Sequence, residues 1–377
     1  MKLFLIAGEP SGDKLGAALM AGLRALGADV TFAGIGGPHM QAEGLTSLFP
    51  MEDLAVMGLA EVLPKLRHLF RRRDEAVASI SAFAPDALIT IDSPDFCLRV
   101  AAKARKATPN LRTIHYVAPS VWAWRPERAE KLARNIDHVL ALLPFEPPLM
   151  RKAGMSCDFV GHPVVAEPLA TPEEAGRFRE RHGIDGPLAL ILPGSRRSEV
   201  SRLAPIFGEA LRALPQGARV VVPAVDHLRD MVDQLVRHWP GTPLVVTQSA
   251  DKRAAFRAAT AALAASGTVS LELAANGVPM VIAYDMNWLS RQIIARKLLV
   301  DTVTLVNLVS ETRAVPEFLG EKCKPGPVGA ALADLLRVPS QRDRQLAALD
   351  MTMDRLGRGG QPPGQRAARS VLSVLAE

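Results

Sequence analysis

The sequence has few cysteines, few aromatic residues and no long uninterrupted apolar run. The three cysteines, Cys97, Cys157 and Cys323, are widely spaced and form no CxxC pair, which argues against a disulfide framework and a zinc site. No apolar stretch approaches the roughly 18 residues that a membrane-spanning helix needs, and residues 1–7 are too short an apolar run for a secretory leader. We therefore expect a protein of the reducing cytoplasm, for which any membrane contact is peripheral.

Two signatures of nucleotide binding are also missing, although the charge of the chain favours an anionic partner. The sequence contains no GxGxxG spacing and no Walker sequence, so neither a dinucleotide fold nor a P-loop is supported. The net charge of +6 and the pI of about 9.4 predict attraction to phosphorylated substrates, anionic lipid or nucleic acid. Aromatic residues make up only 5% of the chain and no nucleic-acid-binding module is recognisable, which argues against nucleic acid.

Short apolar runs alternate with helical patterns along the chain, which is typical of parallel α/β layers. The expected strands are residues 3–7, 87–91, 112–117, 138–142, 188–192, 219–222, 244–246 and 280–284. A polar, proline-containing stretch at 161–174 separates two sets of these units, each large enough for its own sheet. The sequence therefore predicts an α/β protein with domains at 1–165 and 166–340, followed by C-terminal helices at 341–377 that can pack back on the first domain.

Loops that follow parallel strands are the expected functional sites, because ligands bind beyond the carboxyl ends of the strands. The first such loop has two glycines and several polar side chains, which either face a substrate or cap the next helix. Its candidate residues are Gly8, Glu9, Ser11, Gly12 and Asp13. After the strand at 87–91, Asp92 and Asp95 flank a proline, and either carboxylate can accept the proton of an attacking hydroxyl or cap a helix. Asp95 is the favoured base and Asp92 is its rival.

Two further features of the first half suggest ligand contacts. Residues 117–125 contain two of the four tryptophans, including Trp122, beside Arg125, and such rings either line a ligand site or pack in the core. His162 lies in the turn at 161–163, where it either touches a ligand or has a structural role. We therefore treat Trp122 and His162 as candidates for ligand contact, with a structural role as the alternative for each.

Two loops of the second half suit a phosphate-bearing ligand. In the first, Ser195, Arg196 and Arg197 follow a strand and begin a helix, and guanidinium groups with backbone amides suit phosphate oxygens. A solvated charged cap is the alternative interpretation of this loop.

The second of these loops is a turn of small residues before a helix. The Ser266, Gly267 and Thr268 amides and hydroxyls can hold a diphosphate, and Glu272, one turn inside the helix, can accept hydrogen bonds from ribose hydroxyls. A capped structural helix would also explain this turn.

Seven segments together resemble the signature set of the lipid-A-disaccharide synthase family, in the same order and across nearly the whole chain. They read AGEPSGD, IDSPDF, YVAPSVWAWR, GHPV, PGSRRSE, SGTVSLELA and VNL. The resemblance implies a GT-B architecture, in which two Rossmann-like domains face a cleft. It places the nucleotide on the C-terminal domain and the acceptor on the N-terminal domain.

The resemblance also implies a reaction and roles for individual residues. Diacylglucosamine passes from UDP-2,3-diacylglucosamine to the 6-hydroxyl of 2,3-diacylglucosamine 1-phosphate, with inversion, to give a β-1,6-linked disaccharide 1-phosphate and UDP. Asp95 would be the base, while Arg196 and the turn at 266–268 would stabilise the departing diphosphate. Glu272 would hold the ribose, and Asn307 in VNL resembles a polar family position near the donor.

Several points stay open beside the resemblance. The adjacent Arg197 can share or replace the role of Arg196, and Asp92 stays a rival to Asp95. No metal and no cofactor are expected, because GT-B enzymes usually lack the metal-holding DxD motif and arginines with helix amides can replace that ion. A homodimer, with or without exchange of the C-terminal helices, is also open.

Residues 56–73 form an amphipathic pattern that suits the inner face of an anionic cytoplasmic membrane. Apolar residues at near-helical spacing alternate with basic ones, and each basic residue near acidic lipid contributes about 1 kcal/mol. These residues are Leu59, Leu63, Lys65, Leu66, Arg67, Leu69, Phe70, Arg71, Arg72 and Arg73. An ordinary amphipathic helix with a basic outer face explains the pattern equally well.

Two other functions are compatible with parts of the sequence. A UDP-N-acetylglucosamine epimerase of similar fold would share the nucleotide-binding half but would need no surface for acyl chains. A non-catalytic protein with a basic binding face would need neither a nucleotide site nor a surface for acyl chains, and its glycine-rich loops would be structural.

Overall fold

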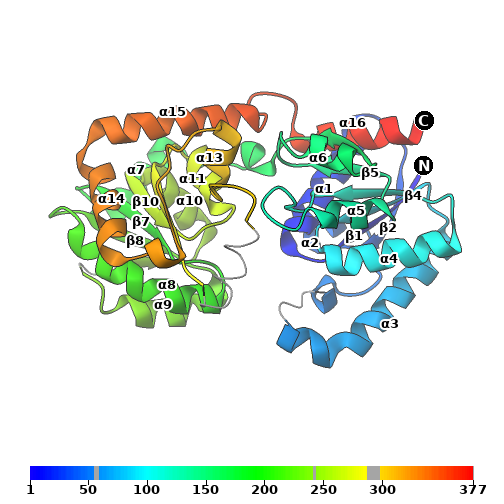
Figure 1. Ribbon diagram of the computed structural model, residues 1–377, viewed down its shortest axis with the longest axis horizontal. Coiled ribbons are helices and arrows are strands. Elements are labelled where there is room, and N and C mark those ends of the chain that lie inside the picture. The colour runs from blue at the N-terminus through cyan, green and yellow to red at the C-terminus, as the bar shows by residue number, and fades with distance from the viewer. Residues whose placement is uncertain (55–58, 241–242, 287–297, 377) are drawn as a thin grey trace. The chain divides into compact units, whose positions relative to one another are not determined.

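A computed structural model describes residues 1–54, 59–240, 243–286 and 298–376 (Figure 1). The chain divides into two compact units, residues 1–166 together with 359–377, and residues 167–358. Each unit is built on one parallel six-stranded sheet, so the predicted α/β class with two Rossmann-like sheets is confirmed. Among the described residues, no helix combines the length and the apolar character needed to cross a membrane.

The sheet of the first unit has the strand order β2-β1-β3-β4-β5-β6. Its strands are β1 (Lys2–Ala7), β2 (Thr31–Ile35), β3 (Ala87–Ile91), β4 (Arg112–Tyr116), β5 (His138–Ala141) and β6 (Ser156–Phe159). Ala7 of β1 pairs with Ile91 of β3, which in turn pairs with Tyr116 of β4. The loops that follow these three strands therefore leave the same edge of the sheet side by side.

Helices cover both faces of this sheet, which explains why β3 is buried along its whole length. The helical elements are α1 (Pro10–Ala25), α2 (Pro38–Ala42), η1 (Met51–Leu54), α3 (Leu59–Phe83), α4 (Pro94–Ala107), α5 (Glu127–Ala133), α6 (Pro147–Lys152), η2 (Pro163–Ala166) and α16 (Pro363–Ala376). Leu19 and Leu23 of α1 share one apolar cluster with Val371 of α16. Ile80 of α3 and Val100 of α4 share the cluster on the other face.

The C-terminal helix α16 packs closely along α1, although the two are far apart in sequence (Figure 1). The approach depends on two glycines, because a Cβ added to Gly22 would lie 2.4 Å from the carbonyl oxygen of Gly364. A Cβ added to Gly364 would lie 2.4 Å from the carbonyl oxygen of Ala18. The C-terminal segment is thereby held against the sheet that the N-terminus begins.

We expect Gly22→Ala to lower the stability of the protein, because the new methyl group would meet backbone that cannot turn aside. Overpacking of this kind typically costs about 1–3 kcal/mol, more than the roughly 0.5–1 kcal/mol that a helix gains from Ala over Gly. Gly176→Ala in α7 (Pro172–Arg181) is the control, because no described atom lies within 4 Å of its added Cβ. Thermal unfolding should give a lower midpoint for Gly22→Ala and an equal or higher one for Gly176→Ala. Equal gains in both variants would contradict the close packing.

The sheet of the second unit has the order β12-β11-β10-β7-β8-β9. Its strands are β7 (Leu188–Leu192), β8 (Arg219–Pro223), β9 (Leu244–Val246), β10 (Ala261–Ala264), β11 (Met280–Tyr284) and β12 (Glu317–Leu319). Leu192 of β7 pairs with Ala264 of β10, so the loops after these two strands are neighbours.

Helices of the second unit complete its two covering layers and include one of the two predicted C-terminal helices. They are α7 (Pro172–Arg181), α8 (Arg197–Ala210), η3 (Leu211–Ala213), η4 (Asp226–Leu228), α9 (Arg229–Val236), α10 (Ser249–Ala258), α11 (Val269–Ala275), α13 (Leu305–Ser310), η5 (Gly320–Lys322), α14 (Pro325–Arg337) and α15 (Pro339–Arg355). The side-chain amide of Gln345 in α15 bonds both the N–H and the carbonyl of Met280, at 2.8 and 3.1 Å. The segment at 341–377 is therefore divided between the units, with α15 in the second and α16 in the first.

Candidate active site

Asp92 and Asp95 lie in the loop between β3 and α4, and the structure gives them different surroundings. Asp92 and Ser93 both have positive φ, 54° and 43°, an uncommon conformation that costs free energy in residues with a Cβ. The Asp92 carboxylate accepts from the N–H of Ser93 at 2.9 Å, which stabilises this bend. Asp95 is exposed in the first turn of α4, and its carboxylate makes no hydrogen bond to any described residue. Asp92 is therefore partly engaged in holding the loop, whereas the Asp95 side chain is exposed to solvent.

The loop after β1 touches the loop of the two aspartates. A Cβ added to Gly8 would lie 2.5 Å from Oγ of Ser93, so only glycine fits this approach without a shift. The hydroxyl of Ser11 lies 3.5 Å from a carboxylate oxygen of Asp92. The structure thus brings Gly8, Ser11, Asp92 and Asp95 together at one edge of the first sheet.

The other residues of the first loop have structural positions. Glu9 is the residue before α1, and its carbonyl accepts from the N–H of Asp13 at 3.0 Å. Gly12 packs against β3, where an added Cβ would lie 3.2 Å from the carbonyl oxygen of Ile91. The buried carboxylate of Asp13 accepts three backbone N–H groups, those of Gly37, His39 and Met40, all at 2.9 Å. The Asp13 carboxylate therefore caps α2 and not α1, the helix that follows this loop and for which the sequence suggested a cap.

Trp122 and His162 lie near the carboxyl ends of β4 and β6. The ring of Trp122 meets that of Phe145 edge-on, with centroids 5.5 Å apart and planes at 83°. Nδ1 of His162 accepts from the N–H of Val164 at 3.2 Å, and burial lowers the pKa of His162 to about 4. His162 is therefore neutral at pH 7 and holds its own turn, while Trp122 packs against the loop after β5.

Arg196 lies in the basic loop before α8, beside Glu199 of the first turn. The Arg196 guanidinium lies 3.2 Å from the Glu199 carboxylate and is 61% exposed, so most of its donors face solvent. Glu199 also accepts from the N–H of Ser195 at 3.3 Å, which shapes the loop. The exposed side chain of Arg197 points elsewhere, with its guanidinium 3.6 Å from the sulfur of Met231. The geometry thus distinguishes the two adjacent arginines.

Tyr284, at the end of β11, is a neighbour of this loop that the sequence did not indicate. Burial and the nearby Glu199 raise the pKa of Tyr284, while Arg196 and Arg202 lower it. A single tyrosine at the end of an apolar strand carries no signal that would reveal such a neighbourhood in advance.

The turn after β10 presents small polar groups beside the basic loop. Gly267 has a φ of 152°, and its carbonyl accepts from the Ser270 hydroxyl at 2.9 Å. Gly267 and Thr268 are exposed, Ser266 is half-buried, and the Glu272 side chain is exposed on α11. Because β10 is next to β7, these groups and the basic loop lie at one edge of the second sheet.

Asn307 is placed differently from the other donor-side candidates. Its side chain is 1% exposed, and its amide donates to Thr302 Oγ1 at 3.2 Å and to the carbonyl of Val315 at 2.9 Å. Its amide oxygen accepts from the N–H of Val315 at 3.0 Å. Asn307 therefore ties α13 to the segment that follows it and has little capacity left for a ligand.

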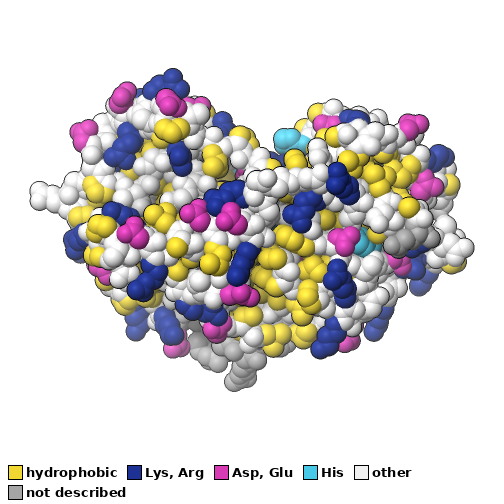
Figure 2. Space-filling model, turned by 90° about the horizontal axis from the view of Figure 1, so that it is seen from above, with side chains coloured by type: hydrophobic (Ala, Val, Ile, Leu, Met, Phe, Trp, Pro, Cys, Tyr) yellow, Lys and Arg dark blue, Asp and Glu magenta, His cyan; other side chains and the backbone are white. Residues whose placement is uncertain are grey.

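The amphipathic segment at 56–73 is covered by the described residues only in part. Residues 56–58 lie outside the described ranges, as do the side chains of Leu59, Leu63 and Lys65. In α3, Leu66 and Leu69 are half-buried and Phe70 is 39% exposed. Arg72 and Arg73 form ion pairs with neighbouring carboxylates. Figure 2 shows one face of the molecule on which basic side chains are interspersed with acidic and apolar ones rather than gathered in one patch.

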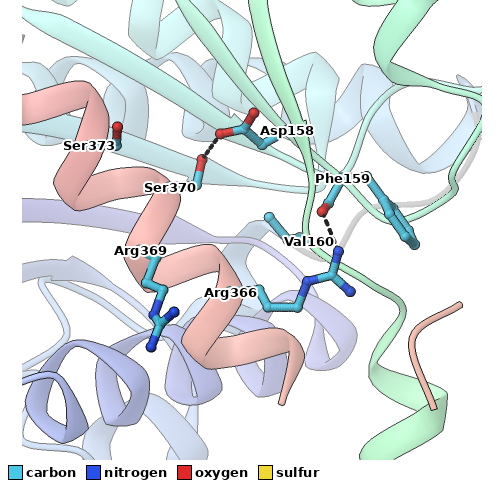
Figure 3. Close-up of a pocket in the computed structure, with 7 residues that line it drawn as sticks. All are labelled: Asp158, Phe159, Val160, Arg366, Arg369, Ser370 and Ser373. Carbon is cyan, nitrogen blue, oxygen red and sulfur yellow. Dashed lines mark hydrogen bonds between the residues drawn. The ribbon is translucent and has the colours of Figure 1, made fainter. Parts of the chain in front are cut away.

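A pocket of about 370 Å³ lies between α16 and β6 (Figure 3). The Ser370 hydroxyl donates to the Asp158 carboxylate at 2.7 Å, and Nε2 of the buried His138 lies 2.8 Å from the same hydroxyl. The guanidinium of Arg366 donates to the carbonyl of Phe159 at 2.7 Å. These bonds join groups of the pocket to one another, so they attach α16 to the edge of the sheet.

No three His, Cys, Asp or Glu side chains come together as a metal site requires, within the part of the chain that the structure describes. The three cysteines are buried, and none of them forms a disulfide with another described residue. Metal independence remains a prediction for experiment.

The fold resembles that of nucleotide-sugar enzymes with two parallel α/β units. A UDP-N-acetylglucosamine 2-epimerase of Neisseria meningitidis, solved with UDP-GlcNAc, aligns over all of both chains with a TM-score of 0.66 and 11% identity. MurG of Acinetobacter baumannii aligns over 100% of this chain and 99% of its own with a TM-score of 0.56 and 15% identity. At such low identity these likenesses show the fold alone, and they define the chain as a GT-B-type protein.

Sequence relatives narrow the class to one family. The family model for lipid-A-disaccharide synthetase matches residues 3–360. The lipid-A-disaccharide synthase of Ruegeria pomeroyi is 59% identical over 387 residues, covering 100% of this chain and 96% of the relative. That of Rhodospirillum centenum is 49% identical, covering 100% of this chain and 95% of the relative. The chain belongs to the lipid-A-disaccharide synthase family and is a glycosyltransferase, which confirms the family assigned from the seven motifs.

Proposed function

We propose that the protein joins UDP-2,3-diacylglucosamine to 2,3-diacylglucosamine 1-phosphate, forming the β-1,6-linked disaccharide 1-phosphate and UDP. The observation that carries this proposal is the family match over residues 3–360. The exposed carboxylate of Asp95 and the exposed guanidinium of Arg196 supply the two kinds of group that such a transfer needs.

The acceptor hydroxyl is activated by the first unit in this proposal. Asp95 accepts the proton of the 6-hydroxyl while the hydroxyl oxygen attacks the anomeric carbon of the donor. The bond from that carbon to the UDP oxygen breaks in the same step. A single displacement inverts the anomeric configuration. Asp95 suits this role better than Asp92, because Asp92 is engaged with Ser93 and lies near Ser11.

The loops after β7 and β10 of the second unit hold the donor in this proposal. Arg196 and the hydroxyls of Ser266 and Thr268 meet the diphosphate, whose negative charge grows as UDP departs. Glu272 accepts from the ribose hydroxyls, and Arg197 has a secondary role because its side chain turns toward Met231.

Three of the predicted site residues act indirectly in this scheme. The Asp13 carboxylate caps α2, and Asn307 ties α13 to the residues around Val315. His162 holds the turn before η2. All three support the shape of the loops and make no proposed contact with either substrate.

We test the reaction with wild-type protein, both substrates in mixed micelles, and EDTA. Formation of a phosphorylated, tetraacylated disaccharide and UDP supports the reaction and its independence of metal together. Product that requires added magnesium would overturn only the metal-free part. Turnover of lipid-free UDP-N-acetylglucosamine without any disaccharide would instead indicate an epimerase.

The substrates are lipids, so we also propose peripheral contact with an anionic membrane through α3. Phe70 is 39% exposed, and Arg67 and Arg71 are exposed on the same helix. Since each basic residue near acidic lipid is worth about 1 kcal/mol, the double variant Arg67→Ala, Arg71→Ala should bind anionic vesicles roughly thirtyfold more weakly. Sedimentation with vesicles at low salt measures this binding.

The control for that experiment removes the same charge elsewhere. Arg212 and Arg344 are exposed in the second unit, so Arg212→Ala with Arg344→Ala should bind as the wild type does. Equal loss in both double variants would assign the binding to net charge and would contradict a specific role of α3.

A further inference from the structure

Glu146 is a buried acid that belongs to none of the seven motifs and has no part in the proposed transfer. It follows β5 directly before α6 and is 3% exposed. One carboxyl oxygen accepts from the N–H of Leu143 at 3.0 Å, and the N–H of Leu142 also faces the group. Burial raises the pKa of Glu146 to about 8, although both N–H groups and Trp122 oppose the rise. The side chain is therefore largely a neutral acid at pH 7.

The group that faces Glu146 from another loop is the indole of Trp122. The indole N–H is buried and has no hydrogen-bond partner of good geometry among the described atoms. The indole is nevertheless close enough to the Glu146 carboxyl to lower its pKa. The same indole packs edge-on against Phe145, the residue before Glu146. Phe145 and Glu146 thus hold two sides of one tryptophan, and they join the loop after β5 to the loop after β4.

The loop that carries Trp122 needs such outside support. Val117 at its start has a φ of 84° and Arg125 at its end has a φ of 54°, both costly for residues with a Cβ. A segment strained at both ends keeps one conformation only when its surroundings determine it. The loop follows β4, whose Tyr116 pairs with Ile91 of β3, so it leaves the sheet beside the loop of Asp95.

We propose that Glu146 is a positioning residue that holds the Trp122 indole, and with it residues 117–125, in the arrangement that binds the acceptor. The kinetic part of this inference rests on the proposed function, whereas the contact between Glu146 and Trp122 does not. Burial raises the pKa of the nearby Cys157 thiol in β6; ionised Glu146 and Asp158 would raise that pKa further, and Arg151 lowers it. Ionisation of Glu146 in this dry space favours opening of the loop to water.

Tryptophan fluorescence tests the contact without any substrate. The emission of the wild type should change as the pH rises, with a midpoint near 8. Glu146→Gln keeps the shape and an oxygen acceptor but cannot ionise, so it should abolish this change. Trp122→Phe should abolish it as well. An unaltered transition in either variant would overturn the proposal.

Stability offers a second readout of the same titration. The folded chain holds the Glu146 proton up to a pH of about 8, whereas the ordinary pKa of a glutamate carboxyl, which applies to the unfolded chain, is 4.5. The unfolded state therefore binds fewer protons in this window, and the stability that this group contributes falls as the pH rises from 4.5 to 8. The thermal midpoint of Glu146→Gln, compared with that of the wild type, should rise between pH 6 and pH 9. An equal difference at both values would contradict a buried neutral acid.

Kinetics test the positioning role. Glu146→Ala should raise the KM for the acceptor roughly tenfold and change kcat far less, and Glu146→Gln should restore the KM at pH 7. An unchanged KM in Glu146→Ala would exclude the role. Absence of disaccharide in the wild type would reject the proposed function, and the fluorescence result would still decide the contact between Glu146 and Trp122.

Discussion

Asp95→Asn should lower the rate of disaccharide formation by roughly a hundredfold to ten-thousandfold, the range that general base catalysis contributes. Asparagine keeps the size of the side chain and the possibility of hydrogen bonding, but it cannot accept the proton of the acceptor hydroxyl. Because Asp95 is exposed and makes no hydrogen bond to described residues, the fold should tolerate the change. Initial rates with saturating substrates measure the effect, and the KM for either substrate should change little.

Two variants separate this effect from weaker ones. Asp92→Asn retains one oxygen that can accept from Ser93, so it should lower the rate much less than Asp95→Asn does. Asp230→Asn removes another exposed acid from a first helical turn, in α9, and should leave the rate unchanged. If Asp92→Asn abolished the reaction and Asp95→Asn did not, the base would be Asp92.

Arg196→Ala should lower kcat by roughly a hundredfold to a thousandfold, the typical loss on removal of one group that stabilises developing charge. The negative charge on UDP increases as the bond to the sugar breaks, and the Arg196 guanidinium, although paired with Glu199, is 61% exposed and can meet that charge. The same variant should bind UDP more weakly, because the product carries the same diphosphate. Steady-state kinetics and calorimetric binding of UDP measure the two effects.

Two other arginine variants, Arg197→Ala and Arg212→Ala, serve as comparisons for Arg196→Ala. Arg197→Ala should have a smaller effect, because that side chain turns toward Met231. Arg212→Ala removes an exposed arginine that pairs with Glu209 and should change neither kcat nor UDP binding. A larger loss in Arg197→Ala than in Arg196→Ala would exchange the roles of the two arginines.

The eight strands expected from the sequence are all present, and the described residues form four more strands that the pattern did not indicate. β10 reads AALA, and alanine favours helices, yet this segment lies between β7 and β11 and is buried on both faces. β12 has three residues and lies at the edge of its sheet, so it is too short to give an alternating signal. β2 contains Gly34, and β6 is a short edge strand with polar residues at Ser156 and Asp158. Strands of this kind are determined by their neighbours in the sheet.

The candidate loops could be named from the sequence because each is contiguous and follows a strand. Geometry then separated residues that look alike in the sequence. Asp13 and Asp95 are both acids just inside a helix, but the first is buried against three backbone N–H groups and the second is exposed. No local sequence pattern indicates a role for Glu146, because the Trp122 indole that it is proposed to hold lies in another loop.

The sequence by itself determined the α/β class, the succession of strand and loop motifs, and the family, because these properties depend on residues that are close together along the chain. The tertiary structure alone decided which candidate side chains are exposed, which cap a helix or tie two segments together, and that α16 returns to α1 through Gly22 and Gly364. The physical reason is that strand register and close packing join residues far apart in sequence. No local pattern of apolar and polar residues specifies those partners.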